Sequence, residues 1–443
     1  MTSEKLSRNS SDSFPSELDL FQAPVQKTGI LEGEWIEKTP HGGIASGDSP
    51  IEFLIDGSTD HYIDLNNTFL SIQCHVKKYD GTLLPEDSAV IPANYLLHTL
   101  FQSLDIEING IEVEHESNYA YRAYLETLLN HGTEAKSTHL ATSMWYNNIP
   151  PKATADYTDH ELELAAPLAS KIAKRNMIDM IGRIHSDLFH QIRYLIPGMN
   201  IRIQLRRNNS RFVLEKLKNS DTNEYIIDLV KAELLVRRVK VHPTVYTTHH
   251  QLLGKGHSVQ YPINHVETMF FTVSSGRQDQ NITVLQNRQI PKRLLFCLVN
   301  HSAKNGSYQT NPFAFHHYNM SSCNLIVDGH PVLNKPLKMS VENGIYMRAY
   351  FNLLSVSGKA LLNEGTSITH EDFVNGKCII AFDLAPDLCQ GDGVHAIKHG
   401  TTSLELAFSS PLPHTISVFV YCEFDDLIEI NNSRVATFAT RST

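Results

Sequence analysis

The chain has 443 residues, of which 41% are hydrophobic and 19% charged, and this balance excludes wholesale disorder. Its length exceeds that of one ordinary core and predicts two or three domains, or one large double domain. The formal net charge of −10 argues against a protein that coats nucleic acid by neutralising phosphates. Any contact with nucleic acid must therefore be local.

The best candidate for a local nucleic-acid contact is the basic stretch from Arg202 to Lys240. Two interpretations apply to it: a phosphate-binding patch, or charged strand faces and edges that discourage sheet pairing, which we favour. The other cations of the stretch that we considered are Arg206, Arg207, Arg211, Lys216, Lys218, Arg237 and Arg238.

The cysteines and the N-terminus indicate an intracellular protein. Six cysteines lie far apart in the sequence, without a CxxC pair or zinc-type Cys/His spacing, so we expect reduced thiols. The segment Met1–Phe21 is polar and Ser-rich, whereas a signal peptide needs an apolar core. No run reaches the 18 apolar residues of a membrane span. We therefore expect neither ordinary secretion nor a membrane span.

Taken in chain order, the predicted elements are mostly strands. Residues 69–76, 200–209 and 402–410 alternate apolar and polar side chains with the period of a half-buried strand. A short helix is predicted around Asn94–Phe101, and a clearer one over Tyr121–Asn130, where apolar residues recur at helical spacing. The turn signals between strands are Asp80-Gly81, Asn109-Gly110, Asp328-Gly329 and Asn375-Gly376.

A long-period repeat divides the chain into two halves. The segment Ser103–Val113 (SLDIEINGIEV) matches Ser322–Val332 (SCNLIVDGHPV) without a gap, at an offset of 219 residues. An Arg-Ala-Tyr triplet follows in each half, at residues 122–124 and 348–350. Asp-Leu pairs at 187–188 and 383–384 and apolar closing strands around 232–241 and 416–424 keep the same order. The repeat predicts a duplicated domain.

The fold class predicted is all-β, with two tandem jelly-roll β-sandwiches and short inserted helices. Each half has about eight strands and needs face-to-face sheets to bury its apolar residues, which a jelly roll provides. The predicted boundaries are a flexible N-terminal arm at 1–40, jelly roll 1 at 41–242, a linker at 243–262, jelly roll 2 at 263–431 and a C-terminal tail at 432–443.

Signals of catalysis are weak, so we predict no catalytic, cofactor-binding or metal-binding residue and no enzyme. The motif Gly254–Ser258 (GKGHS) lacks the spacing of a phosphate loop. The pairs His249-His250 and His316-His317, taken as strand residues, would point to opposite faces and could not readily chelate one ion. The clusters Thr158–Glu163 and Glu423–Glu429 could hold catalytic carboxylates or Ca²⁺, but are interpreted as solvated loops. Asp387–Gly393 is interpreted as a turn-rich loop without an ion.

Several phrases of the first half resemble one protein family. They are SELDLFQAPVQKTGI, SPIEFLIDGSTDHYIDL, LLHTLFQSLDIEINGIEV, YAYRAYLETLLNHG and LATSMWYNN, and the resemblance is strong from about Ser16 to Trp145. They are similar to the double jelly-roll, hexon-like major capsid protein of Polinton/Maverick elements and adintoviruses. The resemblance continues more diffusely through IPGMNIRIQL and the second half.

The resemblance implies a structural protein. In that family two jelly rolls stand side by side with strands roughly normal to the shell, and three subunits form a pseudo-hexagonal homotrimer. Such capsomers tile an icosahedral shell around double-stranded DNA, with a separate penton protein at the vertices. It implies a virion protein made in the host cytoplasm and assembled in the nucleus. The arm, with only four basic residues, would contact DNA weakly.

Two alternatives are retained. One is a tandem jelly-roll glycan-binding protein or glycan amidase, which would need aromatic and acidic residues in one cleft; Trp35 and Trp145 are the only tryptophans. The other is a resident genomic copy whose product no longer assembles. In the repeated helix, Arg122 has either a structural role, as we expect for Tyr124, or is a solvated surface residue.

Overall fold

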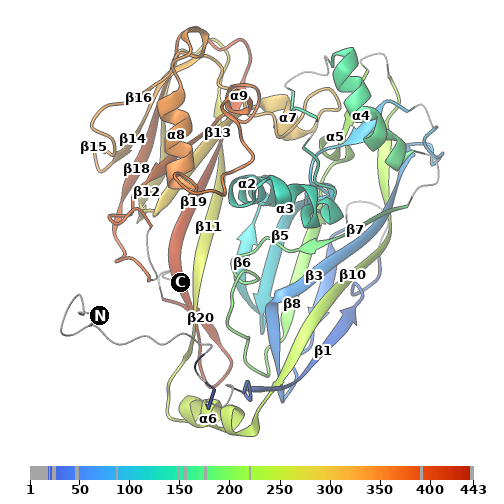
Figure 1. The fold of residues 1–443 in the computed structure, drawn as a ribbon, viewed down its shortest axis with the longest axis vertical. Helices are drawn as coiled ribbons and strands as arrows, with labels where there is room; N and C mark the ends of the chain where they lie inside the picture. Colours follow the sequence, from blue (N-terminus) through green and yellow to red (C-terminus); the bar gives the residue numbers. More distant parts are fainter. Residues whose placement is uncertain are drawn as a thin grey trace.

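A computed structural model describes residues 18, 20–21, 26–44, 49–85, 88–147, 149–152, 157–173, 177–218, 221–389 and 393–439. Two β-sandwiches stand side by side, with their longest strands running along the long axis of the molecule (Figure 1). The all-β class and the tandem jelly-roll arrangement predicted from the sequence are confirmed by these sheets.

The first sandwich consists of two four-stranded antiparallel sheets in the orders β1-β10-β3-β7 and β2-β8-β5-β6, with a small β4-β9 pair beside them. The strands are β1 (Ile30–Lys38), β2 (Ile51–Ile55), β3 (His61–Lys78), β4 (Val90–Pro92), β5 (Phe101–Ile108), β6 (Ile111–Glu116), β7 (Ile178–Arg183), β8 (Ile201–Arg207), β9 (Leu214–Lys216) and β10 (Tyr225–Val241).

The second sandwich repeats this order with β11-β19-β13-β17 and β12-β18-β14-β15, to which β20 and β16 add short pairs. Strands β1, β10, β3 and β7 correspond in position to β11, β19, β13 and β17, so the duplication is visible in the topology. The strands are β11 (Val259–Val273), β12 (Asp279–Gln289), β13 (Arg293–Asn300), β14 (Met320–Val327), β15 (His330–Pro331), β16 (Leu337–Lys338), β17 (Ile379–Asp383), β18 (His399–Phe408), β19 (Ile416–Ile430) and β20 (Ala436–Phe438).

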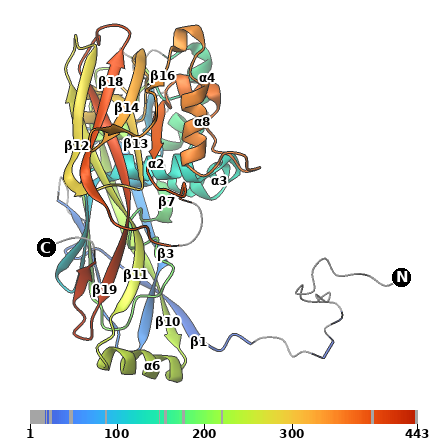
Figure 2. The same ribbon diagram turned by 90° about the vertical axis from the view of Figure 1, so that its left-hand side faces the viewer.

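The helices lie between strands and cover sheet faces and ends. In the side view, α2, α3 and α8 gather on one side of the sheets and α6 lies at the foot (Figure 2). Among the described residues, no helix is both long and apolar enough to cross a membrane. The helices are α1 (Leu96–Thr99), α2 (Tyr119–Asn130), α3 (Thr133–Ser137), η2 (His139–Ser143), α4 (Asp159–Ile172), α5 (Ser210–Val213), α6 (Pro243–Gly254), α7 (His301–Asn305), η3 (Val341–Asn343), α8 (Met347–Val356) and α9 (His370–Val374).

Strand alternation produces the core. In β3, Leu70, Ile72 and Cys74 are fully buried, whereas the residues between them are partly exposed, as the period of two requires. The buried apolar residues of the two sandwiches form one continuous cluster. The predicted helix over Tyr121–Asn130 is confirmed as α2, and the weak helix near Asn94–Phe101 is confirmed as the single turn α1.

The acidic cluster Thr158–Glu163 was predicted to be a solvated loop, and this prediction is wrong. The cluster forms the start of helix α4. The Thr158 side chain accepts a hydrogen bond from the Glu161 backbone N–H, and the Glu161 side chain accepts one from the Thr158 backbone N–H. This capping box was present in the sequence as Thr followed by Glu three residues later. The prediction failed because the acidic residues were considered without the apolar positions that follow them.

Two segments differ from the predicted boundaries. Residues 30–38, assigned to the flexible arm, form β1 and pair with β10. Residues 243–254 of the predicted linker form α6, with Pro243 in the first turn and the His242 side chain as its cap, and β11 begins at Val259. An exposed edge strand needs little apolar patterning, which explains why β1 was missed. Residues 1–17 of the arm and 440–443 of the tail lie outside the described residues.

We predict that Gly376→Ala destabilises the contact between the sandwiches. Gly376 has a φ of +111°, and an added Cβ would lie 2.6 Å from the Pro151 carbonyl oxygen. The substitution should cost about 1–3 kcal/mol of unfolding free energy, measured by chemical denaturation. Gly254→Ala is the control, because no atom lies within 4 Å of its added Cβ. Equal effects of the two substitutions would contradict the prediction.

Candidate functional site

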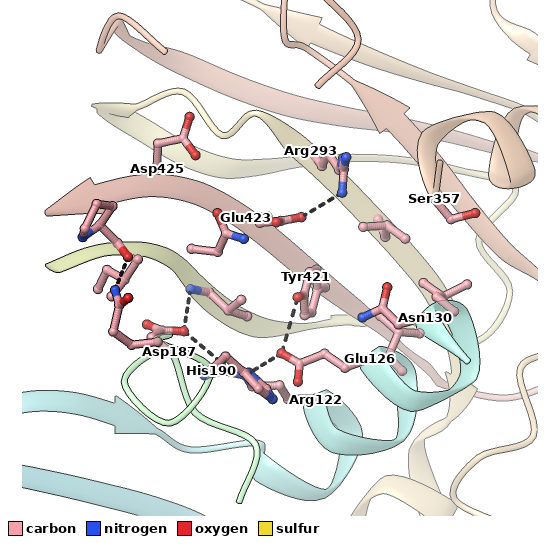
Figure 3. A pocket seen from close by; sticks show the side chains of 18 of the residues that line it. Arg122, Glu126, Asn130, Asp187, His190, Arg293, Ser357, Tyr421, Glu423 and Asp425 are labelled. Atoms are coloured by element: carbon pink, nitrogen blue, oxygen red, sulfur yellow. Dashed lines mark hydrogen bonds and ion pairs between the residues drawn. The ribbon is translucent and has the colours of Figure 1, made fainter. Parts of the chain in front are cut away.

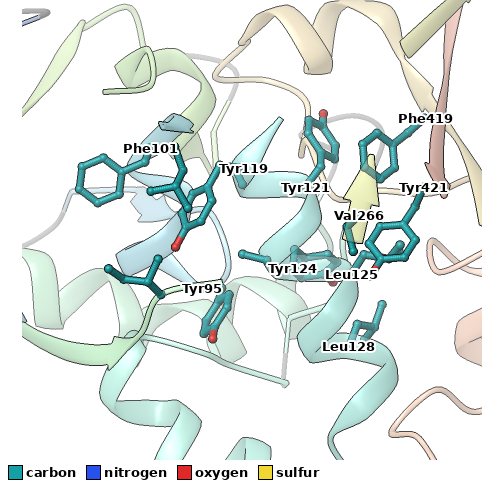
Figure 4. Packing of buried hydrophobic residues seen from close by; sticks show 14 of the residues in the cluster. Tyr95, Phe101, Tyr119, Tyr121, Tyr124, Leu125, Leu128, Val266, Phe419 and Tyr421 are labelled. Atoms are coloured by element: carbon teal, nitrogen blue, oxygen red, sulfur yellow. The ribbon is translucent and has the colours of Figure 1, made fainter. Parts of the chain in front are cut away.

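The two sandwiches meet along helix α2. Figure 4 shows Tyr121 and Leu125 of this helix pointing toward strands of the second sandwich. The Tyr121 ring centroid lies 5.0 Å from that of Phe270 and 5.2 Å from that of Phe419. Tyr124 stacks on Phe313 with centroids 4.1 Å apart. Aromatic pairs of this kind contribute about 0.5–1.5 kcal/mol each beyond their buried area.

Helix α2 is buried on its charged face as well as on its apolar face. Tyr121, Leu125 and Leu128 are each less than 5% exposed, as the helical spacing predicted. Arg122 and Glu126 lie on the same helix and are also enclosed, although neither type is usually buried without a partner. The site therefore contains charge inside an otherwise apolar interface.

Arg122 is the centre of a buried ion-pair network. Its side chain is 1% exposed, and its nitrogens lie 2.8 Å from Glu114 Oε1, 2.8 Å from Glu126 Oε1 and 2.7 Å from Asp187 Oδ1. Glu116 Oε2 lies 3.9 Å away. The planar guanidinium has five N–H donors, so it satisfies carboxylates in several directions at once. Arg122 thus has a structural role and is not a solvated helix residue.

The second sandwich completes this network. His265 on β11 donates to Asp187 Oδ2 at 2.7 Å, and the Val266 backbone N–H donates to the same carboxylate. Thr268 donates to Glu116 at 2.6 Å, and the Tyr421 hydroxyl on β19 donates to Glu126 at 3.4 Å. Some of these interactions are visible in the close view of the cavity (Figure 3). The carboxylates around Arg122 therefore also bind the two sandwiches together.

The pKa values of the carboxyls differ because burial and charge oppose each other. Burial, together with the nearby Asp187, raises the pKa of Glu114 to about 7. Burial also acts on Glu126, but Arg122 and His185 outweigh it and lower the pKa of Glu126 below its usual range. For Asp187, Arg122 and His265 likewise outweigh burial and lower the pKa. Glu126 and Asp187 therefore carry the negative charge that balances Arg122.

A cavity of about 570 Å³ lies beside this network, between α2 and the sheet of β11, β19 and β13. Arg293, Glu423 and Asp425 of the second sandwich line it, with Arg293 3.5 Å from Glu423, and Asp425 also pairs with Lys292 at 2.7 Å. The cluster Glu423–Glu429 was predicted to be a solvated loop, and this prediction is wrong. The cluster lies in β19, where Asp426 is 1% exposed, because alternation places part of it inside the sandwich.

Glu126, His185 and His190 offer ligand atoms within 4.8 Å of one another, the geometry of a possible metal-binding group. Both oxygens of Glu126 already accept hydrogen bonds, from Arg122 and from His185 at 2.7 Å. The other ring nitrogen of His185 lies 2.9 Å from the Tyr95 hydroxyl. Burial lowers the pKa of His190 to about 4, so this ring is neutral near pH 7. These bonds make Glu126 and His185 part of the network, and the His190 ring lies against that of His185, with centroids 5.8 Å apart.

A second buried cation lies at the same interface. Lys136 on α3 donates to the Leu128 carbonyl at 2.8 Å and to the Ser367 hydroxyl of the second sandwich. Burial lowers the pKa of Lys136 to about 7. The site therefore joins the halves through charged groups at several points.

The assumption that the two histidine pairs are strand residues is wrong. His249 and His250 belong to α6, and His249 is 2.8 Å from the Tyr62 hydroxyl. His316 and His317 lie in the loop before β14. Gly254–Ser258 spans the end of α6 and the following turn. The positions of His249, His250 and Gly254 follow from Pro243, a helix-start signal in the segment that was predicted to be a linker.

The loop Asp387–Gly393 is described only in part, since residues 390–392 lie outside the described residues. Asp387 pairs with His395 at 2.8 Å, so its carboxylate is engaged with a side chain.

Several cations of the basic stretch 202–240 pair with carboxylates on neighbouring elements. Arg202 pairs with Glu52 and Glu107 at 2.8 and 2.9 Å, and Arg237 lies 3.6 Å from Asp64. These ion pairs agree with the interpretation that the basic residues of this stretch are charged side chains on strand faces.

Sequence reasoning did not find the Arg122 network. The available signals were Glu126 four residues after Arg122 and two glutamates on the strand before the helix, at 114 and 116. Asp187 is distant in sequence from Arg122 within the first sandwich, and His265 becomes a neighbour of Asp187 only when the second sandwich docks.

Comparisons with known proteins support the fold. No known family profile matches the chain. It is 24% identical over 425 residues to uncharacterized protein F54H12.2 of Caenorhabditis elegans, covering 93% of this chain and 98% of that protein. A chain of the Sputnik virophage structure matches with a TM-score of 0.66 and 12% identity, covering 100% of this chain and 96% of that one. The mavirus major capsid protein matches with a TM-score of 0.53 and 10% identity, covering 99% and 97%. The chain thus has the double jelly-roll fold over its whole length.

We predict that Arg122→Met lowers the unfolding free energy by about 3–5 kcal/mol. Removing the guanidinium leaves buried carboxylates without their cation, which is far more costly than losing a surface pair. Thermal and denaturant unfolding would measure the loss. Arg277→Met is a matched control at an exposed loop residue and should stay within about 0.5 kcal/mol of wild type. A small effect of Arg122→Met would show that the network contributes little.

We predict that Glu126→Gln reduces the acid sensitivity of the fold. A carboxyl whose folded pKa is lowered contributes stability above its ordinary pKa near 4.5 and loses it as the pH falls through the folded value. The stability difference between wild type and Glu126→Gln should therefore narrow below about pH 5. Glu114, whose raised pKa acts in the opposite direction, is present in both proteins. Denaturant titrations from pH 7 to 3 test this, and parallel curves would contradict it.

Proposed function

We propose that this protein is a viral major capsid protein that forms pseudo-hexagonal homotrimeric capsomers, which tile an icosahedral shell around double-stranded DNA. The observation that carries the proposal is the duplicated strand order of two sandwiches along one full-length chain. A chain with two similar domains lets three copies imitate a sixfold unit. The full-length likeness to the mavirus major capsid protein supports the same role.

The finer assignment rests on the sequence phrases that resemble Polinton/Maverick and adintovirus capsid proteins. On this proposal the partners are neighbouring capsomers, a penton protein at the vertices and weak local contacts with packaged DNA. The protein is made in the host cytoplasm, assembles in the nucleus and resides in the virion. It acts as a structural protein and not as an enzyme.

The glycan-binding or glycan-amidase alternative gains no support from the tryptophans. Trp145 is 5% exposed and stacks on Tyr124, with ring centroids 5.2 Å apart, so it is occupied in the core. Trp35 is half-exposed on β1, and the acidic clusters lie on α4 and β19, on different sandwiches. A sugar site would need these groups in one cleft.

We predict that the purified protein forms stable trimers with a mass close to three times 49.9 kDa. Light scattering coupled to gel filtration measures the mass, and electron microscopy should show threefold particles with a hexagonal outline, and closed shells at high concentration. A monomer under all tested salt and pH conditions would overturn the proposal. Glycan binding or hydrolysis abolished by one Asp or Glu substitution would favour the alternative.

A further inference from the structure

Helix α8 of the second sandwich is the counterpart of α2. The Arg-Ala-Tyr triplets place Ala123 and Ala349 at the same helical position, and both are fully buried against their own sandwich. One turn further on, Thr127 and Leu353 are also both fully buried. The two helices therefore sit on their sandwiches in the same orientation.

The opposite faces of the two helices differ in their exposure to solvent. Tyr121, Arg122 and Leu125 on α2 are 4%, 1% and 1% exposed, because the second sandwich covers them. The residues in matching positions on α8 are Met347, Arg348 and Phe351. Met347 is 50% and Phe351 53% exposed, and Arg348 is exposed as well. Nearby Ile345 is 60% exposed. An apolar helix face of this kind marks an interaction surface.

A complementary surface lies on the first sandwich. The sheet that α2 covers contains β11 and β19, whose topological counterparts are β1 and β10. We call the outer side of these strands with the adjoining part of β3 the β1/β10 face. Trp35 and Val230 on it are 50% and 48% exposed. Trp35 also stacks on the partly exposed Phe69, with centroids 5.8 Å apart.

The two surfaces lie on different sandwiches. In Figure 1, α8 lies in front of the strands in the upper part of the second sandwich, whereas β1, β3 and β10 are on the outer side of the first. One chain therefore cannot join them, but a second copy can. Two copies would place α8 against the β1/β10 face as α2 lies against β11 and β19.

The charges also complement each other. Among the described residues, Arg348 forms no ion pair with a carboxylate, unlike Arg122. On the β1/β10 face, Glu37 is exposed, and it too has no ion pair within the described part of the chain. The contact between copies would therefore bring Arg348 to a surface that carries the anion Glu37, and beside it Arg237, whose guanidinium carbon lies 5.6 Å from the Trp35 ring centroid.

We propose that α8 of one copy, through Met347, Arg348 and Phe351, packs on the β1/β10 face of a second copy around Trp35. The contact repeats the interface already built between the two sandwiches of one chain. It is head-to-tail, so the same two surfaces recur at each junction and close into a ring. This inference rests on the proposed homotrimer and specifies which surfaces form it.

The first test breaks each surface separately. Phe351→Asp and Trp35→Asp both place an unpaired charge in the contact, and each should weaken trimer formation by at least about tenfold. Both residues are half-exposed in the chain, so the folded subunit should survive, and circular dichroism checks this. Tyr79→Asp is the control, since Tyr79 is 73% exposed in the turn after β3, beside Glu224 just before the start of β10, whereas Trp35 pairs with Arg237 near the other end of that strand. Analytical ultracentrifugation measures the equilibrium.

The second test restores the contact with opposite charges. Phe351→Lys and Trp35→Glu should each weaken the trimer alone, whereas the double variant should recover part of the lost association. Because Phe351 lies on α8 of the second sandwich and Trp35 on β1, the outer strand of the first, recovery can arise only between copies. Recovery should diminish at high salt, as expected of a charge pair.

The outcomes separate this inference from the proposed function. A wild-type protein that remains monomeric overturns the capsomer proposal and this inference together. A wild-type trimer that tolerates both Asp variants overturns this inference alone. A trimer lost with both Asp variants but not with Tyr79→Asp, and partly recovered in the double variant, supports it.

Discussion

The buried guanidinium of Arg122 is the constraint on which the arrangement of the two sandwiches depends. A cation with 1% exposure needs carboxylates around it, and those carboxylates need further donors. The first sandwich supplies the carboxylates, and the second supplies His265, Thr268 and Tyr421 as donors to them. Separating the halves would leave buried charges incompletely bonded, so the network favours one fixed docking.

The repeated Arg-Ala-Tyr helix has two different environments in one chain. In the first half it is covered by the second sandwich, and Arg122 is enclosed by acidic side chains. In the second half the helix faces outward and Arg348 is exposed. Duplication explains the similarity of the motifs, and position in the chain explains the difference. The duplication leaves α8 and the β1/β10 face without a partner sandwich in the same chain. These are the two surfaces that we propose to join identical copies.

Much of the fold was predictable because its signals are local. Alternation predicted the long strands, and apolar spacing predicted α2. Two elements were missed for separate physical reasons. The edge strand β1 is largely exposed and so carries little apolar alternation, and α4 begins with acidic residues whose capping role was overlooked. The Arg122 network was beyond prediction because its partners come from distant segments.

The sequence by itself determined the duplicated all-β architecture, since strand periodicity, turn residues and the gapless match around Gly110 and Gly329 are all encoded locally. Only the tertiary structure decided which copy of the repeated helix is buried and which is exposed. Side-chain burial depends on docking of the two sandwiches, and residues far apart in the chain, such as Asp187 and His265, meet only after that docking. Similar sequence segments therefore acquire different physical roles.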